Sequence, residues 1–484
     1  MKTVKFIKSK LGYGVGAVGL DLSYGMFYSY LAKYLTDVLH LSPNFLLILT
    51  PIARLWDGIN DPMMGTIVDN THTRMGKYRP WILRGSILNA IVLVFLFWNV
   101  FDLSGTALMV YISVMYVGWG MSNTLADIPY WSMVPSFTSD PKERNLISTL
   151  ARMFSGLGQG IVSIGAPIVM AAVSSTFDEN GEKVFDANSF RTCAIVCAVC
   201  LVLFSSLSVF TTKERVSTKA PEKFSFKKAI QIIKSNDQLI VFMIFAMVSN
   251  AGWYLTSGVA AYYFDVVVGD AEKQSVFNLF QAAGSVVGLL LLPILTKYMS
   301  KRKAYQTSLI LAGVGYIGIT VGAFTDMLMV MNIFYFVCSV GMSSMFIAQT
   351  IFLADVVDYG EVKMGFRAES ITFSMKGFLQ KMAYTLQTII LFASLGISDY
   401  DGELHSQNPE SAKLAITLML CAIPAILFFI SLIIFSTKFK LHGSFMDEIT
   451  AIVTANREKR EALAENGAVK ESAHQDLEDL SDGE

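Results

Sequence analysis

The chain has 484 residues, of which 53% are hydrophobic and only 16% are charged, and its formal net charge is −1. Because soluble domains contain about 25% charged residues, this composition excludes an ordinary soluble protein and predicts an all-α, polytopic membrane protein. A net charge so close to zero gives no reason to expect nucleic acid as a partner.

The chain opens with a basic segment followed by a long apolar run. Lys2, Lys5, Lys8 and Lys10 precede this run, which carries Asp21. The run is too long for a signal peptide and lacks a small-residue cleavage site. We therefore interpret it as the first retained membrane span.

Apolar runs of about 20 residues, the length that crosses a bilayer, recur along the chain. Twelve such runs lie near residues 12–37, 45–68, 81–101, 106–135, 147–175, 191–211, 239–267, 274–296, 304–324, 328–356, 368–396 and 414–437. We therefore expect twelve transmembrane helices. An even number of spans places both termini on the same side of the membrane.

Lysine and arginine are distributed unevenly between the two sets of loops that these spans define. The loops on the side of the termini contain most of them, including Arg74, Lys142 and those of segment 213–234. The opposite loops contain only Lys183, Arg191, Lys273 and Lys413. Under the positive-inside rule, this asymmetry predicts a multi-pass protein of the cell (inner) membrane with both termini in the cytoplasm.

The longest loop on the side of the termini separates the first six spans from the last six. We predict an amino-terminal six-helix bundle (1–211), a cytoplasmic middle loop (212–238), a carboxy-terminal six-helix bundle (239–440) and a cytoplasmic tail (441–484). Two parallel six-helix halves are the architecture of major facilitator transporters. In the tail we expect a short amphipathic helix near 444–463, followed by a disordered acidic segment.

Asp57 and Asp61 lie inside an apolar run, in the stretch PIARLWDGINDPMMG. An ionised carboxylate inside lipid costs at least a few kcal/mol, so it needs a partner or a function. The spacing of four places both acids on one helix face, where their repulsion favours protonation or a bound cation. Two alternatives stay open: a cation binds between them, or Arg54, one turn before Asp57, neutralises the pair.

Two further oxygen-bearing residues fit a cation site, because hard cations prefer oxygen ligands. Asn60 lies on the same segment as the two acids, and Thr124, in the fourth span, could supply a hydroxyl from a facing helix. The alternative is that Asn60-Asp61-Pro62 ends the span, since these residues favour turns. About ten more residues precede the loop at Thr71, so we expect the helix to continue to Val68.

The fourth span also carries a pair that is typical of sugar sites. Asp127 and Trp131 are four residues apart in ADIPYWSMVP. A carboxylate accepts hydrogen bonds from sugar hydroxyls, and an indole face packs on the C–H surface of a pyranose. An interfacial tryptophan is the alternative. Asp21 and Arg152 would add an acceptor and a fork of donors, although Arg152 could instead neutralise an aspartate.

Charged residues cluster at a second place, in the segment DVVDYGEVKMGFRAES at the end of the tenth span. It contains Asp355, Asp358 and Arg367. We interpret this cluster, like the basic loop after the second span, as a latch between helix ends that breaks and re-forms during transport. A solvated charged face is the alternative.

Cysteine and histidine give no sign of a metal centre or of a cofactor. Cys193, Cys197 and Cys200 share one helix face, but three thiols without a nearby histidine are better explained by packing. The five histidines fall in loops or in the tail, and the sequence has no H-E-x-x-H motif. We expect no enzymatic activity, although a membrane enzyme that uses paired carboxylates is an alternative.

At these residues the chain resembles the glycoside–pentoside–hexuronide:cation symporter family of the major facilitator superfamily. The resemblance extends from about Lys10 to Lys440 and is carried by KLGYGVGAVGLD, ARLWDGINDPMMG, MGKYRPWIL, DIPYWSMVP, LADVVDYGE and RAESI. It implies that a monovalent cation binds at Asp57, Asn60, Asp61 and Thr124. It also implies that Asp21, Asp127, Trp131 and Arg152 contact sugar, and that Arg54, Asp355 and Asp358 are gating or structural partners. Lys381 matches a coupling lysine of the family and could pair with Asp57 or Asp61 when the cation is absent.

The chain departs from the family pattern at Asn123, Phe346 and the pair Lys376-Gly377, which border the family's sugar pocket. The identity of the sugar therefore does not carry over. Lys376 adds a positive charge that could attract an acidic sugar, and the alternative is that it reaches to the membrane interface.

These features predict a cation-coupled symporter of a sugar or glycoside that works by alternating access. We expect sodium as the co-transported ion, with lithium or a proton as alternatives, and no cofactor. Binding of the cation would neutralise Asp57 and Asp61 and release Lys381 or Arg152 before the sugar binds. We expect a monomer, and a sodium-coupled lipid carrier of the same fold is the alternative function.

Overall fold

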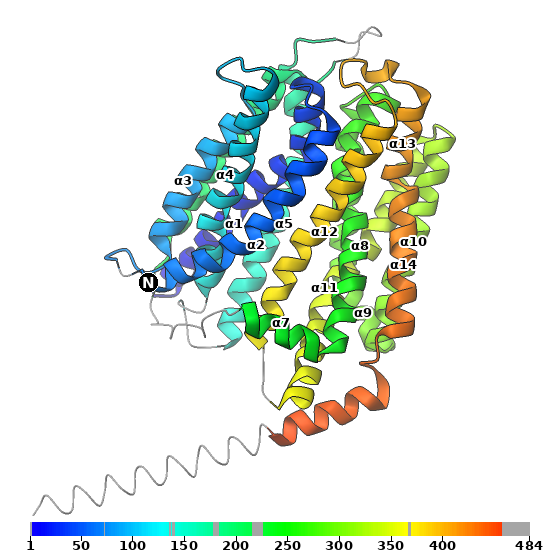
Figure 1. Ribbon diagram of the computed structural model, residues 1–484. Helices are drawn as coiled ribbons and strands as arrows, with labels where there is room; N and C mark the ends of the chain where they lie inside the picture. Colours follow the sequence, from blue (N-terminus) through cyan, green and yellow to red (C-terminus); the bar gives the residue numbers. More distant parts are fainter. Residues whose placement is uncertain are drawn as a thin grey trace, which may run out of the picture.

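The computed structural model describes residues 2–71, 73–134, 137, 141–177, 183–214, 226–365 and 369–456. The described part is helical almost throughout (Figure 1). Its helices are α1 (Lys2–Lys33), α2 (Pro43–Asp69), α3 (Arg79–Leu96), α4 (Gly105–Ser132), α5 (Pro141–Val173), α6 (Ala187–Thr211), α7 (Phe226–Ser235), α8 (Asp237–Tyr262), α9 (Lys273–Tyr298), α10 (Lys301–Phe324), α11 (Leu328–Met364), α12 (Glu369–Ile397), α13 (Glu410–Leu420) and α14 (Ala422–Lys438).

Shorter helical elements extend or join these helices. Two π-helices, η1 (Tyr34–Val38) and η3 (Tyr263–Val267), continue α1 and α8, and a 3₁₀ turn, η4 (His405–Gln407), lies between α12 and α13. Residues 443–456 form a further helix. This helix agrees with the start of the amphipathic helix expected near 444–463, whereas the expected acidic tail lies outside the described residues.

Each of the twelve apolar runs predicted from the sequence corresponds to a long helix, if α13 and α14 are taken together. Eight of these helical segments in the described residues are long and apolar enough to cross a membrane. The other four are α1, α2, α4 and α12. These four helices carry most of the polar residues of the candidate cation and sugar site.

The helices pack into two groups. Within the first, α1 contacts α5 and α6, and α3 contacts α4 and α6; within the second, α8 contacts α12 and α14, and α10 contacts α11 and α14. Figure 1 shows the first group in blue to cyan and the second in green to orange, side by side. We term residues 2–211 of the described chain the first half and residues 237–438 the second half.

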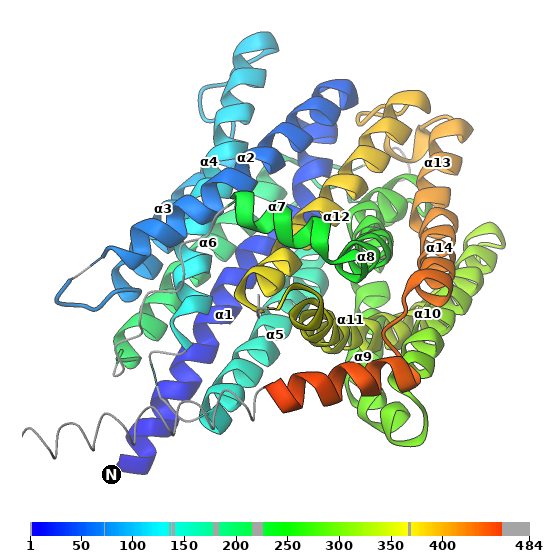
Figure 2. The ribbon, with the colours of Figure 1, turned by 60° about the horizontal axis from the view of Figure 1, so that its bottom comes forward.

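The two ends of the bundle differ. The amino terminus and helix 443–456 lie towards the lower end of the bundle in Figure 1, where α7 also runs across it (Figure 2). We term this end the terminal face. The opposite end, the distal face, holds η1, η3 and η4. Since α2 starts at the distal face, its residues 54–61 lie midway through the bundle.

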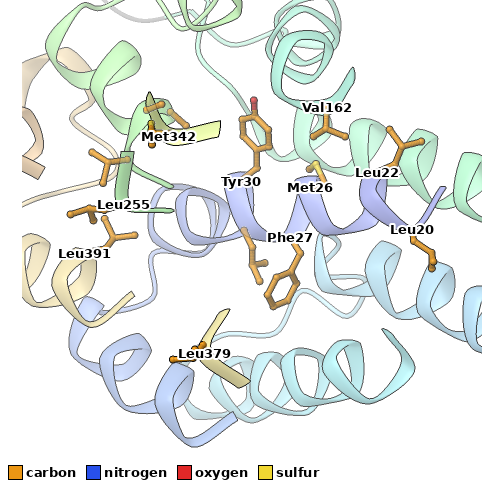
Figure 3. Close-up of a cluster of buried hydrophobic side chains, with 14 of the residues drawn as sticks. Leu20, Leu22, Met26, Phe27, Tyr30, Val162, Leu255, Met342, Leu379 and Leu391 are labelled. Atoms are coloured by element: carbon orange, nitrogen blue, oxygen red, sulfur yellow. The ribbon is translucent and has the colours of Figure 1, made fainter. Parts of the chain in front are cut away.

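The two halves meet along three helix pairs: α1 with α8, α2 with α12, and α5 with α9. Figure 3 shows α1 inside a buried apolar cluster, with Val162 of α5 on one side and Leu255 of α8 and Leu391 of α12 near its distal end. Lipid is as apolar as these side chains, so close packing holds such helices together. At Gly158 of α5, a Cβ would lie 2.6 Å from a carbonyl oxygen of α1, so glycine is needed for this approach.

Polar caps fix several helix ends. The carboxylate of Asp186 accepts the backbone N–H of Ser189 (2.8 Å) and so caps α6. Partial burial opposes ionisation of Asp186, but the hydrogen bonds from Ser189 and Ser175 outweigh it and lower its pKa. Asn236 caps α8 in the same way, accepting from the backbone N–H of Leu239 (3.0 Å). In α2, Asn60-Asp61-Pro62 does not end the helix, which continues to Asp69 as expected.

Candidate cation and sugar site

Helix α2 presents Arg54, Asp57, Asn60 and Asp61 on successive turns in the middle of the bundle. The Arg54 guanidinium donates to the Asp57 carboxylate across 2.8 Å, and both side chains are buried. The pairing of Arg54 with Asp57, one of the two alternatives drawn from the sequence, is therefore present. This pair neutralises Asp57 and leaves Asp61 to be neutralised by a different partner.

Helix α4 makes room for the Asp57 carboxylate. A Cβ at Gly120 would lie 2.7 Å from Asp57 Oδ1, closer than real Cβ contacts allow. The acid therefore lies against the backbone of α4 rather than against a side chain. Sequence reasoning missed Gly120, although a glycine on the helix that supplies Thr124 is a signal that a neighbour approaches closely.

Four aromatic rings surround the Arg54 guanidinium. The centroids lie 5.5 Å away for Phe27, 5.2 Å for Tyr28, 5.8 Å for Tyr116 and 5.3 Å for Tyr384, all within the range of a cation–π interaction. Tyr384 belongs to α12 of the second half. Its hydroxyl also donates to the backbone carbonyl of Tyr28 (2.8 Å), so this aromatic cage joins the two halves.

Asp61 has two partners, one from each half. The Thr124 hydroxyl of α4 donates to Asp61 Oδ1 (2.9 Å), and the Lys381 ammonium of α12 forms an ion pair with Oδ2. The Asp61 side chain is 31% exposed and that of Lys381 is 24% exposed, so water reaches this pair. The two acids that share a helix face thus each have their own base, which removes their mutual repulsion.

The residues predicted to bind the cation are therefore brought together. Asn60 lies between the acids, and its buried amide nitrogen has no hydrogen-bond partner among the described residues. Within the described chain, no group of three or more His, Cys, Asp or Glu side chains could hold a metal ion. A cation at this place would depend on the hydroxyl of Thr124 and the amide oxygen of Asn60 as well as on the carboxylates.

The four predicted sugar contacts form a second group next to the first. The Trp131 indole N–H donates to Asp127 Oδ1 (2.9 Å), and the Arg152 guanidinium carbon lies 3.8 Å from the centroid of the Trp131 ring. Asp21 interacts electrostatically with both Asp127 and Arg152. Helices α1, α4 and α5 each contribute to this group. Arg152 covers one face of the indole, so a pyranose would stack on the other face or displace Arg152.

Asp127 connects the two groups. It lies one turn after Thr124 on α4, and it interacts electrostatically with Arg152 on one side and with Lys381 and Asp61 on the other. A change of charge at Asp61 would therefore be felt at Asp127. Asp127 thus links the candidate cation ligands to the candidate sugar ligands.

The residues at which the chain departs from the family pattern have partners of their own. The Asn123 amide donates to the hydroxyl of Tyr24 (2.8 Å), and Phe346 packs edge-on against Trp253 with a centroid distance of 5.4 Å. The side chain of Lys376 lies outside the described residues. No statement about an acidic sugar follows from it.

The predicted latch at the end of α11 is described only in part. Asp355 forms an ion pair with Lys301 of α10 (3.1 Å), which belongs to the same half, and Asp358 also has an interaction partner. Arg367 lies outside the described residues. The Asp355–Lys301 pair joins two helices of the second half and does not connect the halves.

Sequence reasoning also missed a charged group at the distal face, where Lys33 contacts Asp37 and Asp265. The signal was available, because all three are ionisable residues inside apolar runs that were interpreted as spans.

The family described as "MFS/sugar transport protein" matches residues 12–443. A lactose permease of Lactobacillus delbrueckii subsp. bulgaricus is 24% identical, over 96% of this chain and 75% of the relative. A putative glycoside/cation symporter, YagG, of Escherichia coli (strain K12) is 25% identical, over 93% of this chain and 95% of the relative.

Solved structures share the arrangement of helices. The crystal structure of a D-xylose–proton symporter superimposes with a TM-score of 0.62 and covers 90% of this chain and 98% of that chain, at 13% sequence identity. At this identity the likeness concerns the fold alone. Together with the family match over residues 12–443, it confirms the expected major facilitator fold.

Proposed function

The chain belongs to the MFS/sugar transport protein family, and we propose that it is a cation-coupled symporter of a sugar or glycoside that works by alternating access. It is a multi-pass membrane transporter and not an enzyme. Relatives named as a lactose permease and as a putative glycoside/cation symporter support both the class of substrate and the coupling to a cation.

The observation that carries this proposal is the double attachment of Asp61. Its carboxylate is held by Thr124 of the first half and by Lys381 of the second half. A cation that binds among Asp57, Asn60, Asp61 and Thr124 competes with the Lys381 ammonium for the same carboxylate. Binding therefore releases an ion pair between the halves, which is the physical requirement for coupling ion binding to movement.

We propose sodium as the coupling ion, with lithium or a proton acting at the same carboxylates. A small monovalent cation accepts carboxylate, amide and hydroxyl oxygens together with water, and the partial exposure of Asp61 supplies the water. The site balances two acids against two bases, so the arrival of one cation frees one base. That base is Lys381, since Arg54 is enclosed by aromatic rings.

The sugar would bind among Asp21, Asp127, Trp131 and Arg152, with Asp127 as the link to the cation. The carboxylate of Asp127 would accept sugar hydroxyls, and Trp131 would provide the apolar face. A coupling free energy of about 1–3 kcal/mol between two such sites is typical, and the effect of each ligand on the other is reciprocal. Release of Lys381 alters the field at Asp127 and so favours sugar binding.

The carrier described here would be open towards the cytoplasm. Among the described residues, the contacts between the halves, such as Lys33 with Asp265 and Tyr384 with Tyr28, lie at the distal face or midway. The excess of lysine and arginine at the terminal face supports a cytoplasmic position for that face, in the cell (inner) membrane. The distal face would then be the extracytoplasmic side.

Transport into proteoliposomes tests the proposal. A panel of neutral and acidic glycosides is offered under an imposed sodium gradient and, separately, under a proton gradient. The wild-type protein should accumulate at least one glycoside unaltered against its gradient. D61N should lose accumulation but retain exchange of the same glycoside without a gradient.

The matched control is D326N, which removes an exposed acid in the loop between α10 and α11, where the left-handed backbone (φ 53°) suits asparagine. It should accumulate the glycoside like the wild type. Uphill uptake by D61N would overturn the assignment of the cation site. A chemically altered substrate, or no uptake of any glycoside under either gradient, would overturn the proposed function.

A further inference from the structure

A second cluster of buried charges joins the two halves at the distal face. Lys33, the last residue of α1, is only 1% exposed and contacts two carboxylates, Asp37 of η1 and Asp265 of η3. The distance from Lys33 Nζ to Asp265 Oδ2 is 2.6 Å. One lysine of the first half therefore holds an acid from each half, at the distal face and not midway through the bundle.

The two acids occupy equivalent places in the two halves. Asp37 lies in the π-helix that ends α1, in YLTDV, and Asp265 lies in the π-helix that ends α8, in YFDVV. Helices α1 and α8 are the first long helices of their halves. Single π-helical turns often occur at functional sites, and here both turn an acid towards the same lysine.

Hydrogen bonds satisfy the Asp37 carboxylate. The hydroxyls of Tyr400 (2.5 Å) and Thr36 (2.6 Å) both donate to Asp37 Oδ1. Tyr400 lies after α12, so the second half contributes to this acid too. The loop that carries it packs tightly against η1, since a Cβ at Gly402 would lie 2.5 Å from the Cα of Asp37.

Asp265 has a different second partner. His405 Nδ1 of η4 lies 3.0 Å from Asp265 Oδ2, the same oxygen that Lys33 contacts. The His405 side chain is 21% exposed, so protons reach it from the distal side. Histidine is the side chain whose charge ordinarily changes between about pH 5 and 8.

The charges of this cluster balance only when His405 is protonated. Lys33 supplies one positive charge against the two negative charges of Asp37 and Asp265, and a buried excess of negative charge is unfavourable. A protonated His405 supplies the second positive charge. A neutral His405 leaves the cluster with a net charge of −1, at the contact that holds the distal ends of the halves together.

We propose that protonation of His405 locks the distal ends of the two halves together, so that the pH on the distal side sets how readily the carrier opens to that side. The charged groups nearest to His405 are Asp265, which it contacts directly, and Lys33 of α1, which contacts the same carboxylate. Asp37 of η1 contacts Lys33 in turn. Within its own loop, Glu403 pairs instead with His40 at 3.5 Å, where both side chains are exposed. Acid pH therefore favours the closed distal face, and alkaline pH favours its opening.

The test measures the distance between the distal ends directly. Spin labels are placed at Thr106 and Met329, exposed residues in the first turns of α4 and α11, after the five native cysteines are replaced by alanine. Distances are measured by double electron–electron resonance in lipid nanodiscs, without sodium or sugar, between pH 5.5 and 8.0. In the wild type, the ratio of open to closed distal faces should rise about tenfold over this range.

In H405Q the open fraction should be high at every pH, and its dependence on pH should be lost relative to the wild type. H40Q is the matched control, because it removes the other described histidine of this face without touching Asp265, and it should behave like the wild type. D265N should also open at every pH, because it removes the contact of Lys33 with the second half. It also leaves His405, which belongs to the same half as Asp265, without its acidic partner.

Asp57 and Asp61 are present in both the wild type and H405Q. The contribution of His405 is therefore the difference between the pH dependence of the open fraction in the wild type and in H405Q. An unchanged pH profile in H405Q or D265N, or a lost profile in H40Q, would overturn the proposal. These distances do not depend on which sugar or which cation the carrier transports.

Discussion

Two clusters of buried charge connect the halves of this protein, and they are built differently. In the central cluster, Asp57 and Asp61 come from one helix, and each has its own base, Arg54 or Lys381. In the distal cluster, two acids from opposite halves share the single Lys33. The central pair Asp61–Lys381 is 24–31% exposed, whereas the side chains of the distal lysine and its acids are 1–5% exposed.

This difference in exposure has a functional consequence. At the central cluster Asp61 can exchange Lys381 for a cation, whereas at the distal cluster Lys33 can only keep or lose its contacts with the two acids. The Asp61 carboxylate is partly exposed and already accepts a hydrogen bond from a hydroxyl, so a small cation can replace the ammonium without leaving a bare charge. At Lys33, removal of the lysine leaves two acids shut away from water. Aspartate and lysine thus form an ion-exchange site in the central cluster and a structural contact between the halves in the distal cluster.

The largest effect should follow from removing the shared lysine. K33M leaves two buried carboxylates without their base, and breaking such a buried pair costs about 3–5 kcal/mol. Thermal and denaturant unfolding in detergent should show this loss. K363M removes one partner of an exposed pair with Asp237, and such pairs contribute about 0–1 kcal/mol. Equal stabilities of K33M and K363M would contradict the contrast between the clusters.

Removing the central lysine should change ion binding more than stability. K381M deletes the ammonium that competes for Asp61, so the dissociation constant for sodium should fall about tenfold, equivalent to about 1.4 kcal/mol. Isothermal calorimetry with sodium, without sugar, measures this directly. K363M, which removes one partner of an exposed pair within the second half, should leave sodium affinity unchanged. Weaker sodium binding by K381M would mean that Lys381 is not a competitor of the cation.

A smaller effect is expected from filling the space beside Asp57. In G120A the new methyl group would lie 2.7 Å from Asp57 Oδ1 and push the carboxylate out of position. Sodium affinity should fall about fivefold, or about 1 kcal/mol. G118A on the same helix is the matched control, because its methyl group would make an ordinary 3.7 Å contact with Val92. Equal sodium affinities of the two variants would show that Asp57 does not need this position.

Much of the architecture could be predicted because its signals are local. Each expected apolar run corresponds to a long helix, since a membrane span must satisfy its backbone hydrogen bonds within one segment. The continuation of α2 through Asn60-Asp61-Pro62 also followed from counting residues to the next loop. The spacing of Asp57 and Asp61 placed both acids on one face for the same reason.

The choice of partners was not local, and the sequence left it open. Arg54 and a bound cation were equal alternatives for the two acids, and the fold assigns Arg54 to Asp57 and Lys381, 320 residues away, to Asp61. Lys33 and Asp265 are 232 residues apart, so nothing in either segment indicated that one would neutralise the other.

The sequence by itself determined which segments cross the membrane and which of them carry charge, because hydropathy and helical spacing depend on neighbouring residues. Only the tertiary structure decided which charges meet and how much water reaches them. Both depend on how helices from opposite halves pack, and that packing decides whether a buried acid is available to a cation or locked in an ion pair.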